Sequence, residues 1–516
     1  MANSHLRRPA AGATAKPSVK GLTRSTRWSS LAMLGGEEDA QVYLKEDGED
    51  WLSSLPDDVL LNIVERLSIA DAVRTSILSR RWRPIPAMLS KICITVGSVA
   101  PGHDRTRAGV ARANAAVLRA TASLLQERTT SPYPIRQLCL QFFLGYGFFR
   151  ICWIVADAIA AHKVVPIELD VLTRKETEQC TADNMVDNGM ELNIFLKHYP
   201  AILSGLTRLK LQNVRLPESD LAKLFGLCKQ LEFLRLDNCD MHFISLLQVE
   251  HPQLRELAIL RSSFETVDLK WLPELRTLTF SCWLPQLDDP LSFGHVPLLH
   301  TVSISNKAGL SHKMLKLSEF LRKTTLSNLH VSFQSEKIWV KPEGLRELSQ
   351  VFKKLRFVNL SGISEECDLT WTMFVLHGAP FLEELCIRVC DCLGIWEKKT
   401  LTCSKERKDA DAKWETSASD FKHHNLSVLR IIGFQSEDKF VNYVTAVMES
   451  AVNLKEIYLH EKPVCEKCMY DHRPKNRYPR TKSQRTLVIN SFGMDMRPLL
   501  TLHFPSLREQ CNGSAG

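Results

Sequence analysis

The stretch LTRLKLQNVRLPESDLAKLFGLCKQLEFLRLDNC, residues 206–239, contains one short motif twice. Leucines in the order L-x-x-L-x-L begin at Leu206 and again at Leu231, 25 residues later. Within each copy, apolar and polar residues alternate as they do along a β-strand that buries one face. We therefore predict that each copy forms one short strand, and that a helix or an irregular segment returns the chain to the next, parallel strand.

The same motif recurs through most of the 516-residue chain. Ten clear copies begin at Leu206, Leu231, Leu254, Leu275, Leu299, Leu326, Leu355, Leu382, Leu426 and Leu454, and two weaker ones at Ile135 and Pro166. Successive clear copies are 25, 23, 21, 24, 27, 29, 27, 44 and 28 residues apart. Most of these spacings lie in or near the about 20–29 residues typical of leucine-rich repeats. The predicted fold class is α/β, with an irregular leucine-rich-repeat solenoid over residues 135–425 and a parallel sheet on its concave face.

The array departs from regular repeats in two respects. The ninth position of the repeat is usually Asn or Cys. Cys239 and Cys390 meet this rule, but four other copies have Val214, Ser262, Trp283 and Ile363 there. The spacing of 44 reflects residues 391–424, which carry many charges and few aliphatic side chains, so we predict a mobile insert.

A helical pattern precedes the repeats in DWLSSLPDDVLLNIVERLSIADAVRTSILSRRWRPI, residues 50–85. Apolar residues recur there with the spacing of one helical face, at Leu60, Ile63, Val64 and Leu67. Ser68 is placed to cap a second helix. A third short helix is predicted from Leu78 to Trp82, before Pro84. Because about 40 residues cannot easily form a stable core alone, the exposed apolar residues need a partner or the following domain.

This segment resembles an F-box over residues 51–92. The features that match are the opening Leu55-Pro56-Asp57 and the plant-like Leu78-Ser79-Arg80-Arg81-Trp82. Residues 426–460 resemble the FBD motif, with a strand, a turn at Gly433-Phe434, a helix and a second strand. F-box, irregular repeats and this ending occur in the order typical of the plant F-box/FBD/LRR-repeat family. The resemblance places an N-terminal three-helix F-box before the solenoid.

The resemblance implies a non-catalytic substrate-recognition subunit of an SCF-type cullin–RING E3 ubiquitin ligase. Such an F-box binds a Skp-type adaptor and, through it, cullin and a RING protein. The residues implied for adaptor binding are Leu55, Pro56, Val59, Leu60, Ile63, Leu67, Leu78 and Trp82. Repeat proteins bind partners on their concave surfaces. The residues predicted to contact a target protein there are Arg208, Lys210, Phe233, Arg235, Asp237 and Glu256, and Arg388, Arg430, Tyr458 and His460 share that face.

Composition sets the remaining expectations. Residues 1–50 lack periodicity and are predicted to be a disordered basic tail, residues 93–134 a helical connector, and residues 461–516 a C-terminal tail. Fifteen scattered cysteines without an apolar leader predict a reduced compartment, nucleus and/or cytoplasm. The most apolar window, 138–161, contains Arg150 and Asp157, so no membrane span is predicted.

The sequence lacks hydrolase-elbow, Walker A and H-E-x-x-H motifs, so we predict no catalysis and no cofactor. Cys465, Cys468 and His472 suit three of the four zinc positions, and because a fourth ligand is not evident we predict no metal site. Two alternatives stay open. Residues 465–485 are basic and contain tyrosines, as a nucleic-acid-binding segment does, although a net charge of +8 gives this little weight. The chain is alternatively an F-box scaffold that binds the adaptor without ubiquitylation.

Overall fold

The computed structural model describes residues 51–126, 133–162, 166–241, 246–281, 289–306, 314–334, 338–365, 367–389, 421–462, 477–493 and 499–505. The chain divides into two compact units, residues 1–55 and 56–516. In the first unit the described part contains α1, Trp51–Ser54. The second unit contains the sheets and the other helices.

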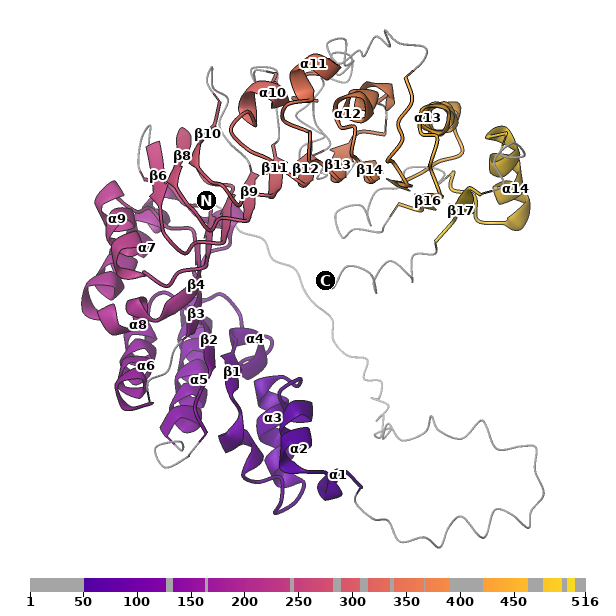
Figure 1. Cartoon of the computed structure of the whole chain (residues 1–516). Helices are drawn as coiled ribbons and strands as arrows, with labels where there is room; N and C mark the ends of the chain where they lie inside the picture. Colours follow the sequence, from indigo (N-terminus) through magenta and orange to yellow (C-terminus); the bar gives the residue numbers. More distant parts are fainter. Residues whose placement is uncertain are drawn as a thin grey trace, which may run out of the picture. The chain divides into compact units, whose positions relative to one another are not determined.

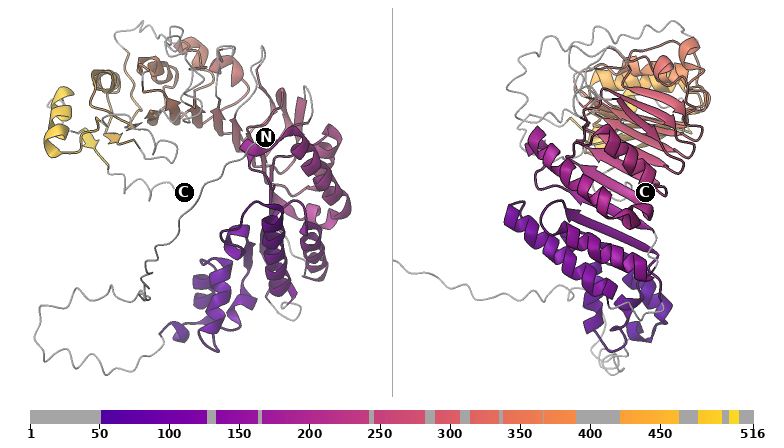
Figure 2. Two further views of the ribbon diagram at one scale, coloured as in Figure 1. Left: turned by 180° about the vertical axis from the view of Figure 1, so that it is seen from behind. Right: turned by 90° about the vertical axis from the view of Figure 1, so that its left-hand side faces the viewer.

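One parallel sheet of 14 strands forms the framework of the second unit (Figures 1 and 2). Its order is β1-β2-β3-β4-β5-β7-β9-β11-β12-β13-β14-β15-β16-β17. The strands are β1 (Lys91–Ile94), β2 (Gln137–Phe143), β3 (Ile167–Leu172), β4 (Leu206–Gln212), β5 (Phe233–Asp237), β7 (Glu256–Leu260), β9 (Thr277–Ser281), β11 (Thr301–Ser305), β12 (Asn328–Ser332), β13 (Phe357–Ile363), β14 (Glu384–Val389), β15 (Val428–Ile432), β16 (Glu456–His460) and β17 (Thr501–His503). Strand order follows chain order, as in a solenoid to which each repeat adds one strand.

The second apolar residue of each of the ten clear copies lies at one register position of this sheet. The row runs through Leu209, Leu234, Leu257, Leu278, Val302, Leu329, Val358, Leu385, Leu429 and Ile457. Each of these side chains is buried. Burying one such side chain stabilises the fold by about 1.5–3 kcal/mol, so the row is a major part of the core. All ten clear copies are therefore adjacent strands, which confirms the predicted repeat and its phase.

Helices cover the outer face of the sheet, opposite the inner face of the bend (Figure 1). They are α5 (Arg107–Gln126), α6 (Phe148–His162), α7 (Ala182–His198), α8 (Pro200–Ser204), α9 (Glu218–Leu227), α10 (Leu317–Phe320), α11 (Leu345–Leu348), α12 (Met373–Gly378), α13 (Asp438–Ser450) and α14 (Lys482–Ser491), with single 3-10 turns η3 (Thr177–Gln179) and η4 (Thr370–Thr372). The short α4 (Val96–Val99) follows β1 at the end of the sheet. Within the described residues, no helix has both the length and the apolar character that a membrane crossing requires. The apolar window 138–161 is divided between β2 and α6.

A second, three-stranded parallel sheet replaces the helices in the middle of the array. It consists of β6 (Leu246–Glu250), β8 (Thr266–Trp271) and β10 (Leu291–His295), in the order β10-β8-β6. Alternate residues of these strands are buried, for example Val267 and Leu269 in β8. The prediction of a helix or an irregular segment between repeats was therefore incomplete, because these short alternating runs pair with one another.

The F-box segment contains two α-helices and two 3-10 helices. These are α2 (Asp57–Val64), α3 (Ile69–Arg74), η1 (Thr75–Ile77) and η2 (Ile85–Met88). The predicted third helix, Leu78–Trp82, is wrong: these residues form turns. Pro84 and Pro86 lie at the start of η2 rather than ending a helix before it, since their fixed φ angles suit a first turn.

The array is longer at both ends than the motif count indicates. β1 lies at the border of the predicted F-box and helical connector, and β17 lies within the predicted C-terminal tail. Their sequences, KICI and TLH, are too short to show the complete motif. The FBD-like segment has the predicted strand, helix and strand, as β15, α13 and β16. The boundaries of the predicted domains otherwise stay predictions.

Candidate partner-binding surfaces

The F-box segment exposes apolar side chains that its own fold does not cover. Val59 and Ile63 lie one helical turn apart on α2, and Ile77 and Leu78 follow α3 with exposed fractions of 82% and 64%. We call the exposed large apolar side chains of residues 56–92 the F-box apolar surface: Val59, Ile63, Leu67, Val73, Ile77 and Leu78. So many exposed apolar side chains within so short a segment indicate a protein-binding surface.

Two residues predicted to contact an adaptor belong instead to the core. Leu60 is fully buried on the inner side of α2, and Trp82 is 4% exposed. Ile85 and Leu89 are buried in the same part of the chain. The sequence pattern placed Leu60, Ile63, Val64 and Leu67 on one helical face, but in the structure Leu60 and Val64 are buried while Ile63 and Leu67 are exposed. Leu60 and Trp82 therefore support the F-box apolar surface without forming it. Pro56 is exposed, and Leu55, in the first unit, is partly exposed.

Polar contacts hold these short helices in place. The Ser68 side chain accepts a hydrogen bond from the Asp71 backbone N–H at 3.2 Å, which is the predicted cap of α3. The hydrogen bond from Ser68 and the neighbouring Arg74 lower the pKa of Asp71. Glu65 at the end of α2 accepts hydrogen bonds from the backbone N–H and the hydroxyl of Ser90, at 2.9 and 2.7 Å. Since Ser90 directly precedes β1, this contact ties the F-box helices to the first strand of the sheet.

The inner face of the sheet presents two rows of side chains that alternate with the buried rows. The first inner row is Cys93, Cys139, Glu168, Arg208, Phe233, Glu256, Thr277, Thr301, Asn328, Phe357, Glu384, Val428, Glu456 and Thr501. The second inner row is Gln141, Asp170, Lys210, Arg235, Ala258, Thr279, Ser303, His330, Asn359, Cys386, Arg430, Tyr458 and His503. Charged side chains lie on both sides of β9 and β11, where the two rows carry only the small, neutral Thr277, Thr279, Thr301 and Ser303.

Comparison with known proteins matches these two parts of the chain. A family model described as the LRR domain of At1g61320/AtMIF1 matches residues 197–488, more than half of the chain, and an F-box domain model matches residues 52–90. The chain belongs to the plant F-box/LRR-repeat family. Its F-box identity and its leucine-rich repeats are thereby established, as the resemblance predicted.

Individual relatives of this F-box protein are similar over limited segments. The Arabidopsis thaliana F-box protein At1g80960 is 47% identical over 55 residues, which are 11% of each chain. The F-box/FBD/LRR-repeat protein At3g52680 of the same plant is 26% identical over 217 residues, covering 41% of this chain and 46% of that protein. The matches thus span less than half the length of these curated relatives.

Near the F-box end of the sheet, most of the residues predicted to bind a target already contact other side chains of the same chain. The Arg208 guanidinium lies 3.9 Å from the centre of the Phe233 ring, and Phe233 is buried beneath it. Arg208 and Lys210 also form ion pairs with Glu168 and Asp170, at 3.9 and 3.8 Å. Phe233 was therefore wrongly predicted as a direct contact, because its neighbour covers it. Arg208 and Lys210 remain accessible.

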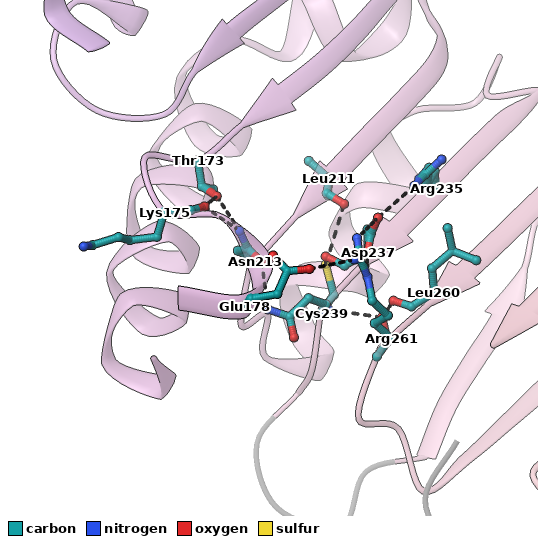
Figure 3. Close-up of polar contacts among 12 residues, drawn as sticks. Thr173, Lys175, Glu178, Leu211, Asn213, Arg235, Asp237, Cys239, Leu260 and Arg261 are labelled. Atoms are coloured by element: carbon teal, nitrogen blue, oxygen red, sulfur yellow. Dashed lines mark hydrogen bonds and ion pairs between the residues drawn. The ribbon is translucent and has the colours of Figure 1, made fainter. Parts of the chain in front are cut away.

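Asp237 is the second correction among the predicted target contacts (Figure 3). Its carboxylate is buried and accepts hydrogen bonds from Arg235 at 2.8 Å and from two nitrogens of Arg261 at 2.9 Å each. Arg261 also pairs with Glu178 at 3.5 Å. Asp237 therefore joins the ends of β5 and β7 and has a structural role. Arg235 is occupied on one side by this pair, and Glu256 is partly exposed.

Asparagines end two strands in the same part of the structure, and sequence reasoning missed them. Asn213 and Asn238 adopt positive φ angles of 54° and 53°, a region that Asn tolerates better than most residues. The Asn213 amide donates to Thr173 Oγ1 at 2.7 Å and to the Lys175 carbonyl at 3.0 Å (Figure 3), and Asn238 donates to Asn213 Oδ1 at 2.7 Å. Both asparagines occupy the eighth position of their repeat. The repeat consensus expects Asn or Cys at the ninth position, so the sequence comparison did not find them.

An aromatic and charged cluster occupies the C-terminal end of the second inner row. Tyr458 stacks on His503 with ring centres 4.4 Å apart, and the Arg430 guanidinium lies 4.3 Å from the Tyr458 ring. Arg430 also donates to Glu384 at 3.1 Å. Burial, together with Arg430 and the neighbouring Arg388, lowers the pKa of His460 to about 4. The contacts of Arg430 with Glu384 and Tyr458 hold the cluster in one arrangement. The cluster combines an arginine with aromatic side chains, and such residues are enriched at the hot spots of protein interfaces.

The predicted Cys465, Cys468 and His472 group lies outside the described residues, as do residues 391–420 of the predicted insert. Within the residues that the structure describes, no group of three or more His, Cys, Asp or Glu side chains is arranged to hold a metal ion. The predictions about zinc and the insert stay predictions.

Proposed function

We propose that this F-box protein is the substrate-recognition subunit of an SCF-type cullin–RING E3 ubiquitin ligase. The F-box apolar surface binds a Skp-type adaptor and, through it, cullin and the RING protein. The inner rows bind a target protein. The chain itself is non-catalytic and acts in the nucleus, the cytoplasm or both.

The observation that carries this proposal is the division of α2 between two environments. Leu60 and Val64 fill the core, while Val59 and Ile63 face solvent, and Ile77 and Leu78 extend the exposed apolar set. A specific protein interface buries about 1,200–2,000 Å² in total around a few well-packed side chains. An F-box that presents apolar residues in this way supports adaptor binding through that surface.

The receptor acts by proximity. When the F-box holds the adaptor and the inner rows hold a target, the target lies near the ubiquitin-charged E2 enzyme, and its effective concentration there rises. Ubiquitin transfer takes place on other subunits, so this chain needs no nucleophile or general base. The contact from Glu65 to Ser90 ties the F-box helices to the first strand, which favours a fixed distance between adaptor and target.

Reconstitution with adaptor, cullin and RING protein tests the proposal. Proteins from plant extract that the complex ubiquitylates are identified with the intact chain and with two variants. Arg430→Ala combined with Tyr458→Ala is expected to retain the adaptor and lose target modification. Leu78→Asp is expected to lose both. A complex that assembles fully but modifies no protein above a chain-free control would instead favour the scaffold without ubiquitylation.

A further inference from the structure

Two thiols lie side by side at the F-box end of the first inner row. Cys93 of β1 and Cys139 of β2 are directly paired in the parallel register, and both are free thiols. Adjacent strands are about 4.7–4.9 Å apart, which lies within the Cα separation of about 4.4–6.8 Å that a disulfide bridges. Cys93 is exposed, while Cys139 is buried beside it.

The surroundings of the pair give the two sulfurs different reactivity. The neighbouring Cys139 thiol, together with Lys91 and Lys210, lowers the pKa of the Cys93 thiol. The neighbouring Cys93, burial and the charge of Glu168 raise the pKa of Cys139. The Cys139 thiol also donates to Glu168 Oε2 at 3.4 Å. Since the thiolate is the reactive form of cysteine, the exposed Cys93 is better placed than the buried Cys139 to react first with a reagent from solution.

Other described cysteines lack this arrangement. Cys228 and Cys239 are buried in the core, and burial raises the pKa of each thiol to about 12. Cys152 is buried in α6, and its pKa is likewise raised by burial. These thiols serve as internal controls, because they share the chain with Cys93 but lack its exposure and its neighbouring thiol.

We propose that Cys93 and Cys139 form a reversible redox site that hydrogen peroxide oxidises to a disulfide. The Cys93 thiolate attacks one peroxide oxygen, so that an S–O bond forms, the O–O bond breaks and hydroxide leaves, giving a sulfenic acid. The Cys139 sulfur then attacks the Cys93 sulfur, so that an S–S bond forms and the S–O bond breaks. The departing hydroxide and the Cys139 proton, relayed by Glu168, form water. The two thiols and one peroxide thus yield one disulfide and two waters.

The position of the pair gives oxidation a structural consequence. β1 directly follows the Ser90 contact with the F-box helices and pairs with β2 in the sheet. A disulfide would close the loop of residues 94–138 and fix β1 to β2 covalently. Cross-linking constrains the unfolded chain, so the oxidised protein is expected to melt at a higher temperature than the reduced protein.

Peptide mapping of the full chain tests the site. The protein is treated with hydrogen peroxide, remaining thiols are alkylated, and the non-reduced protein is cut with trypsin. Oxidation is expected to link peptide 92–105 to peptide 137–150, each of which contains one cysteine, and dithiothreitol should separate them. Two separate peptides, with Cys93 alkylated after peroxide treatment, would overturn the proposal.

Variants assign the role of each sulfur. In Cys139→Ser, oxidation is expected to stop at the sulfenic acid, so dimedone should label Cys93 and leave Cys152 and Cys239 unlabelled. In Cys93→Ser, the linked peptide should be absent. Because Cys93 is exposed, this variant is expected to melt like the reduced wild type. Cys93 that reacts with dimedone no faster than Cys152 in the folded Cys139→Ser variant would contradict its role as the nucleophile.

Discussion

Leu60 and Ile63 are one helical turn apart in α2, yet Leu60 is fully buried and Ile63 is 38% exposed. The first side chain belongs to the core of the F-box segment, and the second belongs to its binding surface. An acidic residue at Leu60 would therefore disturb the fold, and its effect on adaptor binding would be ambiguous. The same substitution at an exposed position of the F-box apolar surface separates binding from folding.

The first prediction concerns this pair. Leu60→Ala is expected to lower the free energy of unfolding by about 2–5 kcal/mol, because it removes buried methyl groups and leaves a cavity. Ile63→Ala should cost no more than about 0.5 kcal/mol, as is usual for exposed sites. Chemical denaturation of both variants measures the difference. Equal losses of stability would show that α2 does not divide its apolar residues between core and surface.

The second prediction concerns the buried carboxylate at the end of β5. Asp237→Ala removes the hydrogen bonds from Arg235 and Arg261 but leaves both arginines partly in solvent, so we expect a loss of about 1.5–3 kcal/mol. Asp240→Ala is the comparison variant: among the described residues Asp240 forms an ion pair with one arginine, Arg215, at 2.5 Å and 2.7 Å, instead of two. Urea unfolding monitored by circular dichroism provides the measurement. Unchanged stability of Asp237→Ala would restore Asp237 as a candidate target contact.

The third prediction concerns pH. The pKa of folded His460 is lowered to about 4 by burial, Arg430 and Arg388, against about 6.5 in the unfolded chain. The unfolded state therefore binds more protons between these values. The stability that neutral His460 contributes is complete above about pH 6.5, falls as the pH drops toward 4 and is lost below that. The difference in stability between wild type and His460→Gln should shrink by about 2–3 kcal/mol across this window. A difference that stays constant from pH 7 to pH 4 would contradict the assignment.

The repeats were predictable because one physical rule operates in all of them. Each strand must bury two alternating apolar side chains against the helices, so the rule is visible in the sequence from Leu209 to Ile457. The second sheet was not predictable, because its strands are short and depend on pairing with one another. β1 and β17 were missed for a similar reason: an end strand needs only one neighbour and tolerates an incomplete motif.

The sequence predicted on which face of the sheet the candidate sites lie. It did not predict which individual residues on that face are accessible to a partner. The pattern places Phe233 and Asp237 on the inner face, where the structure also has them, but it carries no information about the arginines that cover or bind them. Periodicity likewise cannot divide α2 between core and solvent, because both sides of the helix carry apolar residues. The thiol pair at Cys93 and Cys139 depends on a register between strands 46 positions apart, which only the structure provides.

The most direct measurement of the central claim is co-elution with a recombinant plant Skp-type adaptor in size-exclusion chromatography. Leu78→Asp, in the F-box apolar surface, is compared with Leu487→Asp on α14, because the two leucines have exposed fractions of 64% and 67%. Burying an unpaired carboxylate in an interface costs several kcal/mol, so binding should weaken by more than about tenfold. We predict that wild type and Leu487→Asp co-elute with the adaptor and that folded Leu78→Asp elutes alone. Co-elution of Leu78→Asp at wild-type level, or no co-elution of the wild type, would contradict the account.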